Sequence, residues 1–267
     1  MNATHDRIAI HPAAANVGTN MVNIASGKGG VGKTWLSVTL AQTLARDGKV
    51  LLFDGDLGLA NVDIQLGLDV QHDLGEVVAG RLSMSEAVTP FAAGGFDVLA
   101  GKSGSGMLAD LDREQLRGLR EELWRLARRY DHVIVDHGAG VEAAVRALIP
   151  RASTTLVVVT DEPTSLTDSY AFIKLTLQRH ADADVRIVVN MAENVRAGER
   201  TYATIAKACE NFLKVRPPLA GVVPRDSHVP EAIRRQMALL LRHPGSVAAK
   251  GVAMLAKQLR RAQAGHA

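Results

Sequence analysis

The chain has 267 residues, of which 47% are hydrophobic, 4% aromatic and 22% charged, and its formal net charge is +3 at pH 7. This composition predicts one globular domain, or at most two small ones, with an aliphatic core. The single cysteine, Cys209, excludes an internal disulfide framework, and no apolar run is long enough to span a membrane. The first residues lack the basic start and apolar centre of a secretory signal, so we expect a cytoplasmic protein.

Aliphatic runs alternate with helical patterns along most of the chain. We expect residues 1–20 to be a flexible extension, residues 21–262 to form the domain and residues 263–267 to be a short tail. The continuous aliphatic runs indicate strands buried on both faces. The alternation therefore predicts an α/β fold, a doubly wound, mostly parallel sheet with helices on both faces. In chain order, the expected strands are Val22–Ser26, Val50–Asp54, Phe96–Ala100, His132–Asp136, Thr155–Thr160, Arg186–Asn190 and the weaker Leu219–Val223, and the expected helices include Trp35–Arg46, Asp112–Tyr130 and Thr167–His180.

A glycine-rich stretch, Gly27–Thr34, joins the first expected strand to the first expected helix. It fits the pattern Gly-x-x-x-x-Gly-Lys-Thr of a loop whose backbone N–H groups surround phosphates at a helix N-terminus. Lys33 would reach the β- and γ-phosphates of a nucleotide, and the Thr34 hydroxyl would bind Mg²⁺. A glycine-rich turn in an unrelated protein is the alternative. The predicted nucleotide-binding residues here are Gly29, Gly30, Val31, Gly32, Lys33, Thr34 and Trp35.

The loop contains a second lysine, Lys28, which an ordinary phosphate-binding loop does not need. Its position on the far rim argues against contact with phosphates bound by its own loop. We therefore expect Lys28 to reach a nucleotide held by a second copy of the chain. The alternative is a solvated surface lysine.

Acidic residues end two of the expected strands. Asp54 and Asp56 follow one aliphatic strand, and Asp136 closes another. Carboxylates at strand ends near a phosphate site favour a cation, so Asp54 and Asp136 are candidate Mg²⁺ residues. Asp56 is the candidate for orienting the attacking water, although Asp-Gly turns are also common without any such role. For His137, a local structural role is favoured over proton transfer.

Residues after two later strands are candidates for contacting the base. Asn190 ends a strand and offers both a donor and an acceptor to an adenine edge, while Pro224 and Asp226 could close the other side. Each is weak evidence by itself, because an asparagine at a strand end usually caps a turn.

Taken together, these elements resemble the MinD/ParA family of deviant phosphate-loop ATPases, over roughly Met21 to Leu259. The loop Lys28–Thr34 is that family's own variant. The segments Asp54–Asp63, Asp161–Tyr170 and Val189–Met191 are most similar to the FlhG/FleN type, the MinD-like regulators of flagellar number and placement.

The resemblance implies a slow, switch-like ATP hydrolase that uses ATP/ADP and Mg²⁺. Two ATP-bound chains would form a face-to-face homodimer in which Lys28 contacts the partner's nucleotide, and hydrolysis would separate them. Lys28, Lys33 and Asp56 would serve catalysis, and Thr34, Asp54 and Asp136 the metal. A protein partner in flagellar or polar placement is implied, with action in the cytoplasm, at a cell pole or at the inner membrane surface.

The chain departs from the family pattern in three places. His137 stands where the family usually has a small hydroxyl residue, and Met1–Asn20 contains no Asp-Gln-Ala motif. The last amphipathic stretch, Ser246–Ala262, aligns with the final helix of the fold rather than with an added membrane helix. We expect its apolar residues, Val247, Val252, Leu255 and Leu259, to pack on the sheet, although a basic amphipathic helix can also bind anionic lipid.

Two rival functions remain open. A DNA-partitioning ATPase of the ParA type would use the slight basic excess to bind nonspecific DNA, with a steep dependence on salt. A metabolic or metallocluster-assembly member of the same superfamily is the other, and the single cysteine, Cys209, argues against it because the members that carry clusters use paired cysteines.

Overall fold

The structure is a computed structural model that describes residues 20–56, 60–101, 112–138 and 150–264. Its centre is an eight-stranded sheet in the order β3-β4-β2-β5-β1-β6-β7-β8, which confirms the predicted doubly wound α/β class. Every neighbouring pair is parallel except β3 and β4. The strands are β1 (Met21–Ala25), β2 (Val50–Gly55), β3 (Val88–Phe91), β4 (Phe96–Leu99), β5 (His132–His137), β6 (Thr154–Val159), β7 (Val185–Ala192) and β8 (Leu219–Pro224).

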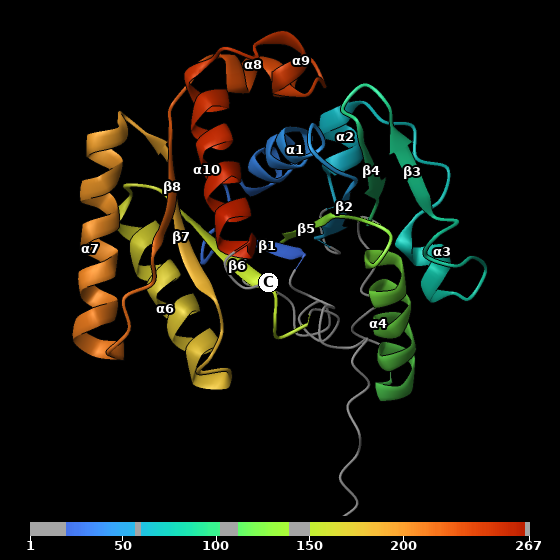
Figure 1. The fold of residues 1–267 in the computed structure, drawn as a ribbon, viewed down its shortest axis with the longest axis horizontal. Helices are drawn as coiled ribbons and strands as arrows, with labels where there is room; N and C mark the ends of the chain where they lie inside the picture. The colour runs from blue at the N-terminus through green and yellow to red at the C-terminus, as the bar shows by residue number, and fades with distance from the viewer. Residues whose placement is uncertain (1–19, 57–59, 102–111, 139–149, 265–267) are drawn as a thin grey trace, which may run out of the picture.

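Helices cover both faces of the sheet (Figure 1). Within the described ranges they are α1 (Lys33–Leu44), α2 (Val62–Leu66), α3 (Leu74–Val78), α4 (Arg113–Ala127), α6 (Pro163–Arg179), α7 (Val195–Leu213), α8 (His228–Arg234), α9 (Leu239–Arg242) and α10 (Val247–Ala264). No helix in these ranges is both long and apolar enough to cross a bilayer.

Alternation along the strands divides the core between the two faces. In β6, Leu156 and Val158 pack in the cluster that contains α1 and α10, whereas Val157 and Val159 pack against α6 and α7. A third cluster, beneath α3 and α4, lies on the same face as the α6–α7 cluster. The carboxyl ends of β1, β2, β5, β6, β7 and β8 therefore share one edge of the sheet, where an open α/β fold binds its ligand.

The antiparallel edge strand β3 was not predicted. It is short, contains Pro90 and lies at the end of the sheet, so it lacks the long aliphatic run of a central strand. Phe91 of β3 packs edge-to-face on Phe96 of β4, with 5.2 Å between ring centroids, and this contact holds the hairpin together.

Helix α10 packs on the sheet, as predicted, through buried Val252, Leu255 and Leu259. The prediction was wrong for Val247, whose side chain is 51% exposed. At 100° per residue, Val247 lies about a third of a turn away from the buried stripe. Ala248 and Ala249 take its place in the core.

Two adjacent residues of α10 test this packing. Leu255 is fully buried and Met254 is 64% exposed. We expect Leu255→Ala to lower the free energy of unfolding by about 2–5 kcal/mol, because it opens a cavity. Met254→Ala, the matched control, should change it by less than about 0.5 kcal/mol. Urea unfolding followed by circular dichroism measures both, and equal effects would contradict the assigned orientation of α10.

Candidate functional site

The loop between β1 and α1 has the backbone shape of an anion-binding site. Gly30 and Gly32 adopt left-handed conformations, with φ of 77° and 86°. Gly32 is the N-cap of α1, and no side chain caps the helix, so its first N–H groups stay available to a ligand. A Cβ atom on Gly32 would lie 2.6 Å from Asn190 Nδ2, so this position requires glycine for space as well as for conformation.

Lys33, the loop lysine, is buried and folded onto its own loop. Its Nζ donates to Ser26 Oγ at 3.0 Å, and Ser26 Oγ donates to the Lys28 carbonyl at 2.6 Å. Burial lowers the pKa of Lys33, although the carboxylates of Asp136 and Asp56 oppose that shift. Ser26 was missed as a site residue because a serine before a glycine-rich turn is unremarkable in sequence.

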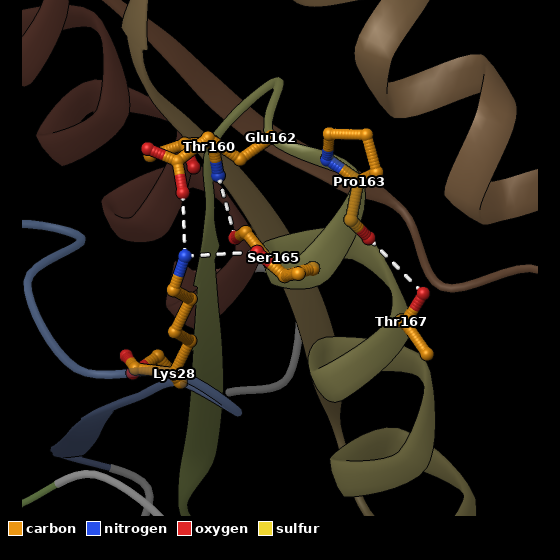
Figure 2. Close-up of polar contacts among 8 residues, drawn as sticks. Lys28, Thr160, Glu162, Pro163, Ser165 and Thr167 are labelled. Carbon is orange, nitrogen blue, oxygen red and sulfur yellow. Dashed lines mark hydrogen bonds and ion pairs between the residues drawn. The ribbon is translucent and has the colours of Figure 1, made fainter.

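Lys28 lies on the rim of the loop, where it contacts the N-terminus of α6 (Figure 2). Its Nζ donates to Glu162 Oε2 at 2.6 Å and to Thr164 Oγ1 at 2.8 Å. The hydrogen bond and the charge of Lys28 lower the pKa of Glu162. Lys28 thus has two partners on its own chain, neither of which was predicted.

The turn that receives Lys28 is held by its own hydrogen bonds. Ser165 Oγ accepts from the Thr160 N–H at 3.0 Å, and Thr167 Oγ1 donates to the Pro163 carbonyl at 3.0 Å (Figure 2). With Pro163 at the first helical position, these bonds fix the start of α6. Glu162 and Thr164 therefore sit at defined positions facing the loop.

Asp54 is the second-last residue of β2, and its carboxylate is almost completely buried. The carboxylate accepts from the backbone N–H groups of Asp56, Asn61 and Val62 at 3.0–3.1 Å. Burial and the nearby Asp136 raise the pKa of Asp54 to about 7, against the effect of these three donors. Asp54 thus also caps the N-terminus of α2.

Asp136 lies directly beside Asp54, because the two are register partners in β5 and β2. Asp136 Oδ1 accepts from Ser37 Oγ at 2.9 Å. Burial raises the pKa of Asp136 to about 6, although hydrogen bonds from Thr34 and Ser37 and the charge of Lys33 oppose the shift. Ser37, one helical turn after Thr34, is a further site residue that the sequence did not single out.

These groups suit a magnesium ion bound together with a nucleotide. Two buried carboxylates repel each other unless a cation lies between them, and oxygen donors are what Mg²⁺ prefers. No group of three or more Asp, Glu, His or Cys side chains that could hold a metal alone occurs in the part of the chain described. A cation here would take its ligands from Thr34, water and phosphate, with the two carboxylates close to that bound water.

Asp56 lies where β2 leaves the sheet, opposite the end of β5. A Cβ atom on Gly138 would be 2.9–3.1 Å from the Asp56 carboxylate atoms, so that carboxylate lies against the Gly138 backbone. Asp56 also acts electrostatically on Lys33 and Asp136. The predicted catalytic and metal residues Lys33, Asp54, Asp56 and Asp136 are therefore neighbours in space.

The candidate base-binding residues lie at the ends of β7 and β8. Asn190 Nδ2 donates to the Val31 carbonyl at 2.8 Å, which joins β7 to the phosphate loop. A cavity of about 400 Å³ beside it is lined by Asp161, Met191, Glu193 and Arg225. Met191 has φ of 56°, an uncommon value for a residue with a side chain.

Two predicted residues have structural roles that were not expected. Asp226 accepts from the backbone of Ala248 and from His228, and although burial opposes the shift, these hydrogen bonds lower its pKa to about 2. Trp35 packs in the core below α1. Asp226 thus anchors the N-terminus of α10, and whether it also contacts a base stays a prediction, as does the predicted role of Pro224.

The raised pKa of Asp54 gives a prediction for the metal-free, nucleotide-free protein. Between the ordinary pKa of 3.8 and about 7, the folded state binds more protons than the unfolded state, so stability falls as pH rises through this range. We expect a higher urea midpoint at pH 5.5 than at pH 7.5, and a smaller difference in Asp54→Asn. Asp182→Asn, at an exposed acid, is the control, and an unchanged pH difference in Asp54→Asn would contradict the assignment.

Comparison with known proteins agrees with this arrangement. Residues 22–240 match the family described as the CobQ/CobB/MinD/ParA nucleotide binding domain. The antiactivator FleN of Pseudomonas aeruginosa is 36% identical over 240 residues, covering 90% of this chain and 85% of FleN. The flagellum site-determining protein YlxH of Helicobacter pylori is 30% identical over 194 residues, covering 72% of this chain and 65% of YlxH.

A solved relative has the same fold. The septum site-determining protein MinD of Pyrococcus horikoshii, complexed with Mg-ADP, superposes with a TM-score of 0.74 at 24% identity, covering 93% of this chain and 98% of that one. The family match extends over more than half of the chain and includes the phosphate loop, both buried acids and the β7 asparagine. The chain therefore belongs to the CobQ/CobB/MinD/ParA nucleotide-binding family, as the loop and the acidic positions predicted.

Proposed function

We propose that this protein is a Mg²⁺-dependent ATPase switch that dimerises with ATP, resets by hydrolysis and regulates flagellar number or placement. The observation that carries the proposal is the placement of its two loop lysines. Lys33 is buried beside two acids, whereas Lys28 is on the rim and contacts α6. This difference supports a role for Lys33 toward the nucleotide of its own chain and a role for Lys28, which is partly exposed, toward a second chain.

Nucleotide binding would use groups that already converge on the loop. Backbone N–H groups from Gly29 to Trp35 bind the phosphates, and Lys33 exchanges Ser26 Oγ for phosphate oxygens. Asn190 and the cavity beside Met191 and Arg225 receive the base. A pocket at these strand ends is where a fold of this class binds a nucleotide.

The magnesium site would lie between Thr34 and the two acids. Mg²⁺ supplies charge neutralisation at the phosphates when bound. Thr34 would offer its hydroxyl, and Asp54 and Asp136, which also accept hydrogen bonds from Val62 and Ser37, would hold water molecules bound to the ion. Asp56, against the Gly138 backbone, orients the attacking water.

Lys28 would change partners during the cycle. Its contacts with Glu162 and Thr164 lie at the surface, with the side chains of Lys28 and Glu162 36% and 60% exposed. Water competes well with such exposed ion pairs, so the contact opens at low cost. In the ATP-bound dimer Lys28 leaves α6 and reaches the partner's triphosphate.

The cellular role rests on the relatives. YlxH is named as a flagellum site-determining protein and FleN as an antiactivator, and this chain covers most of both. The protein would act in the cytoplasm or at a pole through a protein partner. Contact with a membrane surface through the apolar face of α10 would require the helix to leave the core, so that route is disfavoured. ParA-type DNA binding is the second candidate, and the slight basic excess is its only support.

Light scattering tests the switch. With Mg²⁺-ATP, Asp56→Ala should accumulate as a dimer because hydrolysis is blocked, whereas the parent returns to monomer as ATP is consumed. A chain that stays monomeric in the Asp56→Ala form would contradict the ATP-dependent dimer.

Lys28→Ala in the same background separates binding from dimerisation. We expect it to bind ATP within about threefold of the parent affinity, because Lys33 and the loop are intact, yet to remain monomeric. Lys33→Ala should instead lose ATP binding. Equal loss of ATP binding in both variants would show that Lys28 serves its own nucleotide.

Deletion of the gene in the source organism tests the cellular role. Flagella counted by electron microscopy should change in number or position, and the Asp56→Ala allele should not restore the wild-type pattern. Unchanged flagella, together with retention of DNA at low salt in the presence of ATP, would favour the partitioning function.

A further inference from the structure

A chain of buried hydrogen bonds crosses the sheet next to the proposed catalytic site. It begins at His137, the last residue of β5, whose Nε2 lies 3.2 Å from Asn23 Oδ1 in β1. Asn23 Nδ2 donates to Ser153 Oγ at 2.8 Å, and Ser153 Oγ donates to the Pro150 carbonyl at 2.7 Å. His137, Asn23 and Ser153 are each at most 6% exposed. We call these three side chains the relay.

The hydrogen bond from Ser153 to the Pro150 carbonyl determines which atom donates in every other bond of the relay. The Pro150 carbonyl can only accept, so Ser153 uses its single proton there and must accept from Asn23. The Asn23 atom facing Ser153 is then the amide nitrogen, and the oxygen faces His137. His137 must therefore carry its proton on Nε2 and act as a donor.

The relay consists of buried polar side chains in a sheet whose other buried side chains are mostly aliphatic. Asn23 lies in the middle of β1 (Met21–Ala25), all of which is buried. On this face of the sheet it separates the apolar cluster beneath α4 from the cluster beneath α6 and α7. A buried amide in such a position is costly unless it is fully hydrogen-bonded, so its partners fix the local geometry.

Both ends of the relay flank the same connection. His137 and Gly138 come just before residues 139–149, and Pro150 and Ser153 come just after them. The relay thus ties the end of β5 to the residues that lead into β6, across the intervening strand β1. Residues 139–149 begin three residues after Asp136, a proposed metal residue.

The end of β5 is consequently anchored on both faces. Asp136 faces α1 and accepts from Ser37, while His137 faces the opposite side and donates to Asn23. Gly138 follows at once, with the Asp56 carboxylate against its backbone. A shift of the His137 backbone would therefore move the surface against which Asp56 rests.

We propose that His137 is a positioning residue, which through Asn23 and Ser153 holds Gly138 and hence the Asp56 carboxylate in place for hydrolysis. This inference rests on the proposed function. His137 is not among the residues proposed to contact the nucleotide. It acts through the hydrogen bond from Nε2, so any side chain that places an N–H donor at the same reach should substitute for it.

Steady-state ATP hydrolysis tests this role with three variants. His137→Leu removes the donor, and we expect kcat to fall between about 10- and 100-fold, since small misplacements of catalytic groups have effects of that size. KM for ATP should stay within about twofold, because none of the three relay side chains is among the predicted nucleotide-binding residues. His137→Gln keeps an N–H at similar reach and should recover most of kcat. His132→Leu, at the other end of β5, is the matched control and should behave as the parent.

A double-mutant cycle tests the pathway. Asn23→Leu should lower kcat about as much as His137→Leu, and the double variant should be no slower than either single one. If His137→Leu does not fold, Ser153→Ala breaks the far end of the relay and should lower kcat in the same direction. The proposal is wrong if kcat stays within twofold of the parent, if KM rises instead, or if His137→Gln is as slow as His137→Leu.

Hydrogen exchange of the nucleotide-free protein separates this inference from the proposed function. If the unmodified protein does not hydrolyse ATP, the proposed ATPase function is wrong. Hydrogen exchange would then still test whether His137 holds this part of the backbone. Faster exchange at the Gly138 and Ser153 amides in His137→Leu, but not in His137→Gln, would support it. Unchanged exchange at both amides in His137→Leu would overturn it.

Discussion

The constraint on which the site depends is the burial of two carboxylates side by side at the edge of a parallel sheet. Asp54 and Asp136 are register partners, each about 1% exposed, and burial raises the pKa of both. Neighbouring groups stabilise the charged carboxylates and so oppose this pKa shift. They are three backbone N–H groups for Asp54, and Ser37, Thr34 and Lys33 for Asp136. The remaining cost of burying two negative charges would be offset by a metal ion bound together with a nucleotide.

The strand order explains why loops far apart in sequence meet at this site. The parallel order places the ends of β1, β2 and β5 together, so one cation and one phosphate chain can be reached from the loop, from Asp54 and from Asp136. The same topology sends Asn190 to the Val31 carbonyl from β7. The fold thus brings the glycine-rich loop, the two buried acids and the cavity beside Asn190 to one edge of the sheet.

What could be predicted from sequence was local. The loop Gly27–Thr34 and the acids at strand ends follow from short patterns whose chemistry is specific, and the aliphatic runs gave the parallel sheet. Ser26, Ser37 and Glu162 are ordinary residues that gain a role only through contacts made by folding. The pairing of His137 with Asn23, 114 residues apart, is invisible for the same reason. Val247 was misplaced because one apolar residue at a helix start fits more than one face.

The two loop lysines differ in how firmly the chain holds them, and this difference suits a switch. Lys33 is buried against Ser26, with the carboxylates of Asp136 and Asp56 nearby, so its side chain is held within the site. Lys28 is paired at the surface, where solvent screening makes an ion pair easy to exchange for another. A phosphate on a second chain would offer Lys28 more negative charge than the single carboxylate of Glu162. Partner exchange by this lysine would therefore favour association only while the triphosphate is present, and loss of the terminal phosphate would return the advantage to Glu162.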